Sequence, residues 1–253
     1  MQLSGKVVAI TGGGRGLGRA MAQAFAAEGA QIAVLDLNTV DLAETCVQCV
    51  ALGVRAMPYL TDVVDEAQVI ASLDAIVAEF GRLDVLINNA GITRDALLVK
   101  AQDREILAKM TLAQWSSVLD VNLTGVFLCA REAAERMIRL GNGGLIISIS
   151  SISREGNAGQ TNYSAAKAGV AAMTVVWAKE LARHGIRSVA IAPGFCATDI
   201  LAAMKPEIVA RVTAAVPLQR LGDPAEIAST AVYVARNEFV NGRVIEVDGG
   251  LRI

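Results

Sequence analysis

Tyr163 and Lys167 are the residues whose types and spacing point most directly to chemistry. They are four residues apart in a segment with a helical pattern, Thr161 to His184, so their side chains share one helix face. A free phenol has a pKa of about 10, which a neighbouring ammonium lowers. Such a phenol can exchange a proton with an alcohol or carbonyl oxygen. This spacing also arises by chance on ordinary helices. It therefore indicates a catalytic pair only together with the surrounding motifs.

A glycine-rich turn, Thr11 to Gly18, follows the first predicted strand and leads directly into a helix. Its pattern is G-x-x-x-G-x-G, with Arg19 where the third glycine of G-x-G-x-x-G would fall. Glycines in such a turn let backbone N–H groups and the helix N-terminus approach a pyrophosphate. The sequence therefore predicts a dinucleotide site, and the alternative is a strand-to-helix turn without a ligand.

Asp36 ends the second predicted strand, eighteen residues beyond Gly18. A carboxylate there accepts hydrogen bonds from the adenosine ribose and repels a 2′-phosphate, so NAD(H) is preferred over NADP(H). Arg15 in the glycine loop could partly neutralise a phosphate, which keeps NADP(H) possible, and Asp36 could instead cap the next loop. Further along, Asp62 could bind the adenine edge, and Asn88 to Gly91 ends the fourth strand near the cofactor. Either of these two segments could instead be turn chemistry.

The elements that position these residues alternate between strand and helix along the whole chain. Strands are predicted at Val7 to Ile10, Gln31 to Leu35, Ala56 to Tyr59, Leu83 to Asn88, Leu145 to Ser150, Arg187 to Ala192 and Val244 to Val247. Helices are predicted at Gly18 to Glu28, Asp41 to Leu52, Glu66 to Phe80, Thr111 to Leu140, Thr161 to His184 and Pro224 to Ala235. Nearly continuous apolar strands indicate a parallel sheet covered on both faces. We expect one doubly wound α/β domain spanning residues 1–253.

Composition excludes several classes of protein. The 253 residues are 53% hydrophobic with a formal net charge of −2, which argues against disorder and against nucleic-acid binding. Apolar runs are too short to span a membrane and no signal peptide is evident, so we expect a cytoplasmic enzyme. Cys46 and Cys49 form a C-x-x-C inside a helical pattern and are expected to be buried thiols. The single histidine, His184, removes most zinc-ligand sets, and no metal is expected.

Taken together, the motifs resemble those of the short-chain dehydrogenase/reductase family over essentially the whole chain. The resemblance rests on Thr11 to Gly18, Asp62, Asn88 to Gly91, Asn122, Ser150, Tyr163, Lys167, Pro193-Gly194 and Val247 to Gly250. It implies a Rossmann domain with about seven strands, in which Tyr163 is the acid/base and Lys167 lowers its pKa and binds the nicotinamide ribose. It also implies that Ser150 polarises the substrate oxygen and that Asn122 holds a water for proton exchange. The cofactor residues that it implies are Gly12, Arg15, Gly16, Leu17, Gly18, Asp36, Asp62, Val63, Asn89, Ala90, Gly91, Tyr163, Lys167, Pro193, Gly194 and Thr198.

Within this family, the segments Gly156 to Gly169 and Asn88 to Asp95 resemble 3-oxoacyl-[acyl-carrier-protein] reductases. That resemblance implies reduction of a 3-oxoacyl thioester, on acyl carrier protein or CoA, in fatty acid biosynthesis by a homotetramer. The alternatives are an NAD-dependent dehydrogenase of another secondary alcohol, such as a polyol, sugar or hydroxy acid, and a non-catalytic cofactor-sensing binding protein.

Several segments depart from these reductases. They usually use NADPH and lack an acid at the position of Asp36, and the arginines that grip the carrier are replaced by Gly141, with Arg139 nearby, and His184, beside Arg183. Lys100 to Met110 is an apparent insertion whose mixed-charge, helical pattern predicts a solvated surface helix, with a substrate lid as the alternative. The amphipathic stretch Thr198 to Val216 could close over an acyl substrate or pack as a core helix.

Overall fold

A parallel sheet forms the centre of the computed structural model, which describes residues 1–198 and 206–252. The sheet has seven strands in the order β3-β2-β1-β4-β7-β8-β9. Their bounds are β1 Val7–Thr11, β2 Gln31–Asp36, β3 Ala56–Leu60, β4 Val85–Asn88, β7 Gly144–Ile149, β8 Ile186–Pro193 and β9 Val244–Val247. Every residue of β1, β4 and β7 is buried, as expected for strands that are covered on both faces. The predicted doubly wound Rossmann fold is confirmed.

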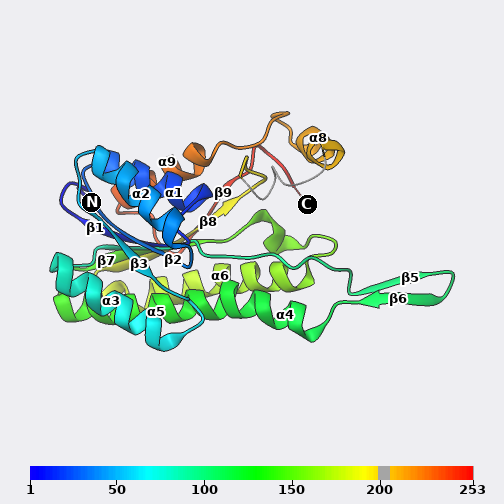
Figure 1. Ribbon diagram of the computed structural model, residues 1–253, viewed down its shortest axis with the longest axis horizontal. Coiled ribbons are helices and arrows are strands. Elements are labelled where there is room, and N and C mark those ends of the chain that lie inside the picture. The colour runs from blue at the N-terminus through cyan, green and yellow to red at the C-terminus, as the bar shows by residue number, and fades with distance from the viewer. Residues whose placement is uncertain (199–205, 253) are drawn as a thin grey trace.

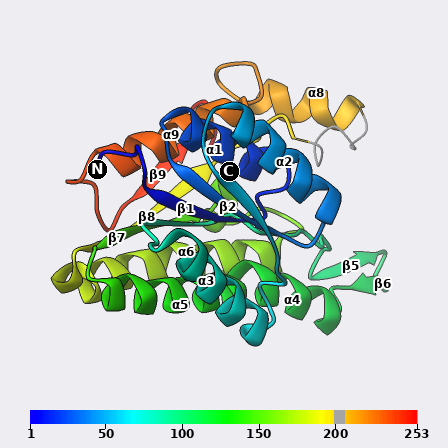
Figure 2. The same cartoon turned by 60° about the vertical axis from the view of Figure 1, so that its left-hand side comes forward.

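Helices cover both faces of the sheet (Figures 1 and 2). One layer contains α1 Gly16–Ala27, α2 Thr39–Ala51 and α9 Pro224–Arg236; the other contains α3 Glu66–Phe80, α4 Leu112–Leu119, α5 Gly125–Leu140 and α6 Thr161–Glu180. Two apolar cores result. Phe25 and Ile10 belong to the first, and Leu86 and Met137 to the second.

The strand order reverses between β1 and β4, which lie side by side in parallel. The chain winds from β1 outward to β3, and from β4 outward in the other direction to β9. At this switch point Thr11 pairs with Asn88, so both strands end side by side at the same edge of the sheet. Ligands of doubly wound sheets bind outside such strand ends.

The predicted helix from Thr111 to Leu140 is interrupted by a wide turn. Thr111 caps α4 through a capping box with Gln114, and the π-helical turn η1 Asp120–Thr124 joins α4 to α5. The next predicted helix ends earlier than expected, because α6 stops at Glu180 and a short 3-10 turn, η3 Ala182–His184, follows. Both helical segments therefore exist, with irregular turns that periodicity did not reveal.

The segment Lys100 to Met110 is not the surface helix that its pattern predicted. It forms most of an antiparallel hairpin, β5 Val99–Gln102 and β6 Glu105–Lys109, which projects away from the rest of the molecule (Figure 1). Asp103 and Arg104 make its turn with φ of 49° and 69°. Two consecutive positive φ values are typical of the turn that matches hairpin twist. Apolar residues alternate in β5, but three of them are consecutive in β6, so a period of two was not evident in the sequence.

The amphipathic stretch after β8 is described in part. Ile200, Leu201 and Met204 lie outside the described residues, and α8 Pro206–Ala215 forms the second half. Each residue of α8 is exposed or half-exposed, so packing into the core is the wrong alternative for this half. The lid interpretation stays a prediction.

The four cysteines are buried free thiols. Burial raises the pKa of both Cys46 and Cys49 to about 11, and that of Cys129 to about 12. The prediction that Cys46 and Cys49 are buried thiols is confirmed.

Candidate active site

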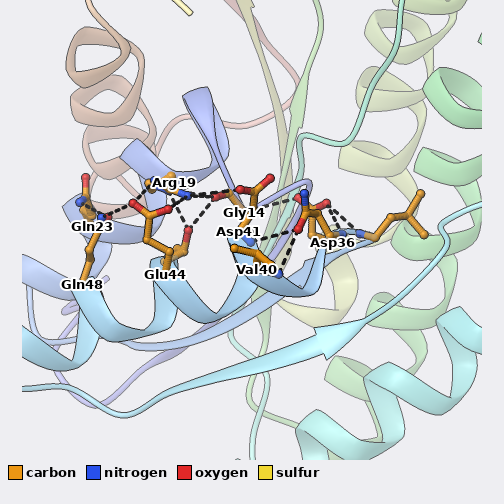
Figure 3. Close-up of polar contacts among 11 residues, drawn as sticks. Gly14, Arg19, Gln23, Asp36, Val40, Asp41, Glu44 and Gln48 are labelled. Atoms are coloured by element: carbon orange, nitrogen blue, oxygen red, sulfur yellow. Dashed lines mark hydrogen bonds and ion pairs between the residues drawn. The ribbon is translucent and has the colours of Figure 1, made fainter. Parts of the chain in front are cut away.

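The glycine loop and the end of β2 are joined by the carboxylate of Asp36 (Figure 3). Its Oδ2 accepts a hydrogen bond from the Gly14 N–H at 2.9 Å. Its Oδ1 accepts from the N–H groups of Leu37 and Asn38 at 2.7 and 3.2 Å. Asp36 thus orders the glycine loop and, as the alternative interpretation predicted, also caps the loop that follows β2, while Asn38 caps the helix α2. A carboxylate offers about four acceptor positions, so capacity remains for a ribose hydroxyl.

Arg19 holds the same loop from the opposite side of the Gly14 peptide. Its Nε and Nη2 donate to the Gly14 carbonyl at 2.9 and 2.5 Å, and Thr45 Oγ1 donates to the same oxygen at 2.9 Å. Glu44 of α2 pairs with the guanidinium at 2.8 Å (Figure 3). Arg19, which replaces the third glycine of the commoner motif, therefore braces the loop against α2.

The loop has the shape that a dinucleotide phosphate requires. A Cβ at Gly18 would lie 2.0 Å from the Gly12 carbonyl oxygen, and one at Gly14 would lie 2.9 Å from Asp36 Oδ2. Around Gly16, by contrast, a Cβ would meet only Thr198 Cγ2, at 3.8 Å. Among the described side chains, none caps the N-terminus of α1, so its first N–H groups can receive an anion. Arg15 and Leu17 flank this open end, and Thr198 faces it.

The end of β4 is tied to the end of β1. Asn89 Nδ2 donates to the carbonyls of Thr11 and Gly12 at 3.1 and 2.8 Å, and the Ala90 N–H donates to Thr11 Oγ1 at 3.1 Å. Asn122, fully buried in η1, accepts from the Ile92 N–H and donates to the Ile92 carbonyl, both at 2.9 Å. The side chain of Asn122 therefore positions the segment that follows Gly91.

The remaining predicted cofactor residues lie at neighbouring strand ends. Asp62 Oδ1 accepts from the Val64 N–H at 3.1 Å in the turn after β3, and Val63 is buried against Gly125. Pro193 ends β8, and the Gly194 N–H donates to the Val247 carbonyl at 2.9 Å.

Tyr163 and Lys167 lie in the first two turns of α6, beside the end of β7. Lys167 Nζ donates to the Ile149 carbonyl at 2.7 Å and lies 5.5 Å from the centre of the Tyr163 ring. Burial lowers the pKa of Lys167 to about 8. Burial also raises the pKa of Tyr163, an effect opposed by a hydrogen bond with Ser151 and increased by the charge of Asp95. The pKa of Tyr163 is therefore raised in this structure, whereas the sequence predicted that Lys167 would lower it.

Of the two adjacent serines, Ser151 lies beside Tyr163, while the side chain of the predicted Ser150 contacts the backbone of Lys167. Ser150 is buried and its Oγ donates to the Lys167 carbonyl at 2.8 Å. Ser151 is the N-cap of the 3-10 turn η2 Ile152–Glu155, where its Oγ accepts from the Ser153 N–H at 3.1 Å, and it lies close enough to Tyr163 to lower the pKa of the phenol. Ser151 is therefore a second candidate for the serine that meets the substrate oxygen, and the role predicted for Ser150 stays a prediction.

Asn162 and Gln160 tie the start of α6 to the segment before the hairpin. Asn162 Nδ2 donates to the carbonyls of Arg94 and Gln114 at 3.1 and 2.9 Å. Gln160 Nε2 donates to Asp95 Oδ2 at 3.0 Å. These contacts place the carboxylate of Asp95 where its charge acts on Tyr163.

Sequence reasoning missed three residues of the site. The only sequence feature that indicated Ser151 was its position next to Ser150. Arg19 was noted only because it occupies the position of the third glycine in G-x-G-x-x-G. Asp95 carried no recognisable signal, because its proximity to Tyr163 depends on the fold.

Comparison with known proteins agrees with this geometry. A family model described as short chain dehydrogenase matches residues 6–208, and the chain belongs to this family of oxidoreductases. It is 40% identical over 255 residues to the 3-oxoacyl-[acyl-carrier-protein] reductase FabG of Thermotoga maritima, covering all of both chains. It is also 40% identical to the short-chain reductase protein NovJ of Streptomyces niveus, covering 96% of this chain and 93% of that one. The crystal structure of an Agrobacterium tumefaciens protein described as a gluconate dehydrogenase superposes with a TM-score of 0.90 at 37% identity, covering 99% and 97% of the two chains.

Proposed function

We propose that this protein is an NAD(H)-preferring enzyme that reduces a 3-oxoacyl thioester to the 3-hydroxyacyl form. The observation that carries the reaction class is the group of Tyr163, Ser151 and buried Lys167 at the strand ends that also hold the glycine loop. The relatives named as 3-oxoacyl-[acyl-carrier-protein] reductases support the substrate class. Retention of all three side chains argues against a non-catalytic cofactor sensor.

Tyr163 is the proton donor in this proposal. A bound nicotinamide cofactor would supply the hydride to the carbonyl carbon. Tyr163 Oη gives its proton to the carbonyl oxygen, and Ser151 Oγ holds that oxygen in place by a hydrogen bond. Burial raises the pKa of Tyr163, which keeps the phenol protonated for reduction. Lys167 supplies a buried cation that favours the phenolate left behind.

The preference for NAD(H) follows from the charges at the end of β2. Asp36 presents a carboxylate there, while Glu44 and the Gly14 carbonyl engage the nearby guanidinium of Arg19. Arg15 is the exposed cation of the loop, and we expect it to contact phosphate rather than reverse the preference. Residues 12–18, Asp62, Val63, 89–91, 193–194 and Thr198 would line the rest of the site.

The basic residues near the positions where these reductases grip the carrier lie at the far ends of α5 and α6. Arg139 ends α5, and Arg183 and His184 follow α6. Tyr163 is the third residue of α6, so about 26 Å of helix follows it before the basic pair. A carrier protein held there would have to present its acyl group over that distance to reach the active site of the same chain. Both CoA and carrier-protein thioesters are therefore substrates to test.

A second candidate is the oxidation of another secondary alcohol, such as a sugar acid. The structural similarity to the protein described as a gluconate dehydrogenase supports it. The same three residues would act in the reverse direction, with Tyr163 as the base.

We also expect one catalytic domain over residues 1–253, a homotetramer and a cytoplasmic location. The apolar side chains of Phe127, Val175 and Val176 are exposed on α5 and α6, which supports association through this layer. Of the helices in residues 1–198 and 206–252, none has the length and apolar character needed to cross a bilayer.

A substrate panel tests the proposal. Acetoacetyl-CoA and acetoacetyl-carrier protein are assayed with NADH and NADPH, and gluconate and a polyol with NAD⁺. We expect the highest kcat/KM for a thioester with NADH. Turnover of gluconate alone would replace the thioester assignment, and a preference for NADPH would contradict the role of Asp36.

A further inference from the structure

The β5–β6 hairpin, called the arm here, extends away from the other helices and strands of residues 1–198 and 206–252. Every residue of both strands is exposed, and both ribbon views show the arm standing apart (Figures 1 and 2). A two-stranded hairpin is marginally stable in water by itself, whereas three or more strands with an apolar face are stable. The arm therefore needs further strands or a covering surface.

The segment that contains the arm is unusually apolar for an exposed one. Leu97, Leu98, Val99, Ile106, Leu107 and Leu112 are between 47% and 77% exposed. Single exposed apolar residues are normal, but several on one short projecting segment indicate a protein contact. Met110 and Leu98 close the base of the arm through a backbone hydrogen bond of 3.2 Å, so these side chains are held in a defined ribbon.

The outer edge of β6 has a charge pattern that is complementary to itself. Inside the arm, Glu105 faces Gln102 and Lys109 faces Val99, both uncharged. If β6 paired antiparallel with a second β6 around Leu107, Glu105 would face the partner subunit's Lys109, and Ile106 would face the partner subunit's Ala108. A two-fold axis makes each of these contacts twice. We propose that the arm joins two copies of this chain by such pairing, which gives a four-stranded antiparallel sheet.

The same features disfavour other partners. Charged residues and bulges on an edge strand normally prevent pairing with arbitrary strands. Here the register shifts between Lys100 and Ala101, so Leu107 is skipped in the pairing of β5 with β6 as described. Leu107 therefore has no opposite residue in β5. It is also the residue through which the proposed two-fold axis passes, because it lies midway between Glu105 and Lys109. Only a strand with the reverse order of charges satisfies both Glu105 and Lys109, and a second copy supplies it.

Cysteine cross-linking tests this contact in the full chain. Directly opposed residues of an antiparallel pair have Cβ atoms about 4.5–5.5 Å apart, close to the separation that a disulfide needs. The native cysteines are buried, so they do not compete. Under mild oxidation, Leu107→Cys should give a cross-linked dimer on a non-reducing gel at low protein concentration. Leu98→Cys and Leu112→Cys, which are 66% and 77% exposed, are the matched controls and should stay monomeric on the gel.

A charge exchange provides the second measurement, in the Leu107→Cys background. Glu105→Lys or Lys109→Glu alone places like charges opposite each other across the axis and should reduce cross-linking at least fivefold. The double variant restores opposite charges and should restore cross-linking. Circular dichroism and turnover control for folding, since neither residue belongs to the site. Equal cross-linking in the Leu112→Cys control, or failure of the double variant to recover, would overturn the proposal.

Discussion

The glycine loop and the β5–β6 arm are both short segments with positive φ values, yet their surroundings are opposite. The loop is held by Asp36, Arg19 and Thr45 and follows β1, the third strand in the order of the sheet. The arm is exposed along its whole length. The first is organised by its own chain for a ligand, and the second carries surface that its own chain leaves uncovered. The cofactor site can therefore be described from a single chain. The role of the arm cannot, because its proposed contact involves a second copy of the chain.

Removing the phenol hydroxyl should separate the chemistry from cofactor binding most clearly. In Tyr163→Phe, kcat should fall by about 10²- to 10⁴-fold, the typical contribution of a positioned acid. The dissociation constant of NADH, measured by fluorescence titration, should change less than about threefold. Retention of more than a tenth of the rate would remove Tyr163 as the proton donor.

Alanine substitutions of Ser150 and Ser151 should have the next largest effects, one on stability and the other on kcat. Ser151→Ala should lower kcat by about 100-fold, because it removes a donor to the reacting oxygen. Ser150→Ala should instead cost about 1 kcal/mol of unfolding free energy, through its buried hydrogen bond to Lys167, with kcat changed little. Steady-state kinetics and urea unfolding of both variants check this. The reverse pattern would return the substrate contact to Ser150.

Arg19 tests whether the brace of the loop supports cofactor binding. Arg19→Leu should weaken NADH binding by about tenfold, or about 1.4 kcal/mol, while kcat at saturating NADH is retained. Gln23→Leu is the control, because Gln23 Nε2 makes a similar contact between α1 and α2, to Gln48 at 2.8 Å, about one turn from the loop (Figure 3). Equal weakening in both variants would mean that only helix packing is involved.

Asp95 should produce the smallest effect, on pH dependence. Its negative charge adds to the burial that raises the pKa of Tyr163. Asp95→Asn therefore lowers the pKa of the phenol, so the alkaline limb of kcat/KM for reduction should shift to lower pH. The acidic limb for oxidation should shift in the same direction. Unchanged limbs would show that Asp95 acts only by holding Gln160.

Most of the fold could be predicted because its signals are local. Apolar strands covered on both faces, and helices with capping residues such as Asp223 and Glu226, follow from short-range physical chemistry. Glycine spacing and the acid at Asp36 similarly marked the nucleotide side of the site.

What could not be predicted depends on distant contacts. The direction of the turn η2 after β7 decides which of the two serines lies near Tyr163. The effect of Asp95 on Tyr163 depends on the contact of Asp95 with Gln160. The arm was mistaken for a helix because its strands are too short for a period of two to dominate. Its stability, if the proposed pairing holds, depends on residues of a second chain.

The π-helical turn between α4 and α5 has a mechanical consequence. A wide turn contains an additional residue without breaking the course of the helix. Deleting that residue would leave an ordinary α-helix but rotate α5 by about 100° relative to α4. Val126, Ala130, Ala133 and Met137, all buried, would then turn away from the sheet. Asp120–Thr124 therefore sets the rotation of α5 relative to α4, which keeps the apolar face of α5 against the sheet.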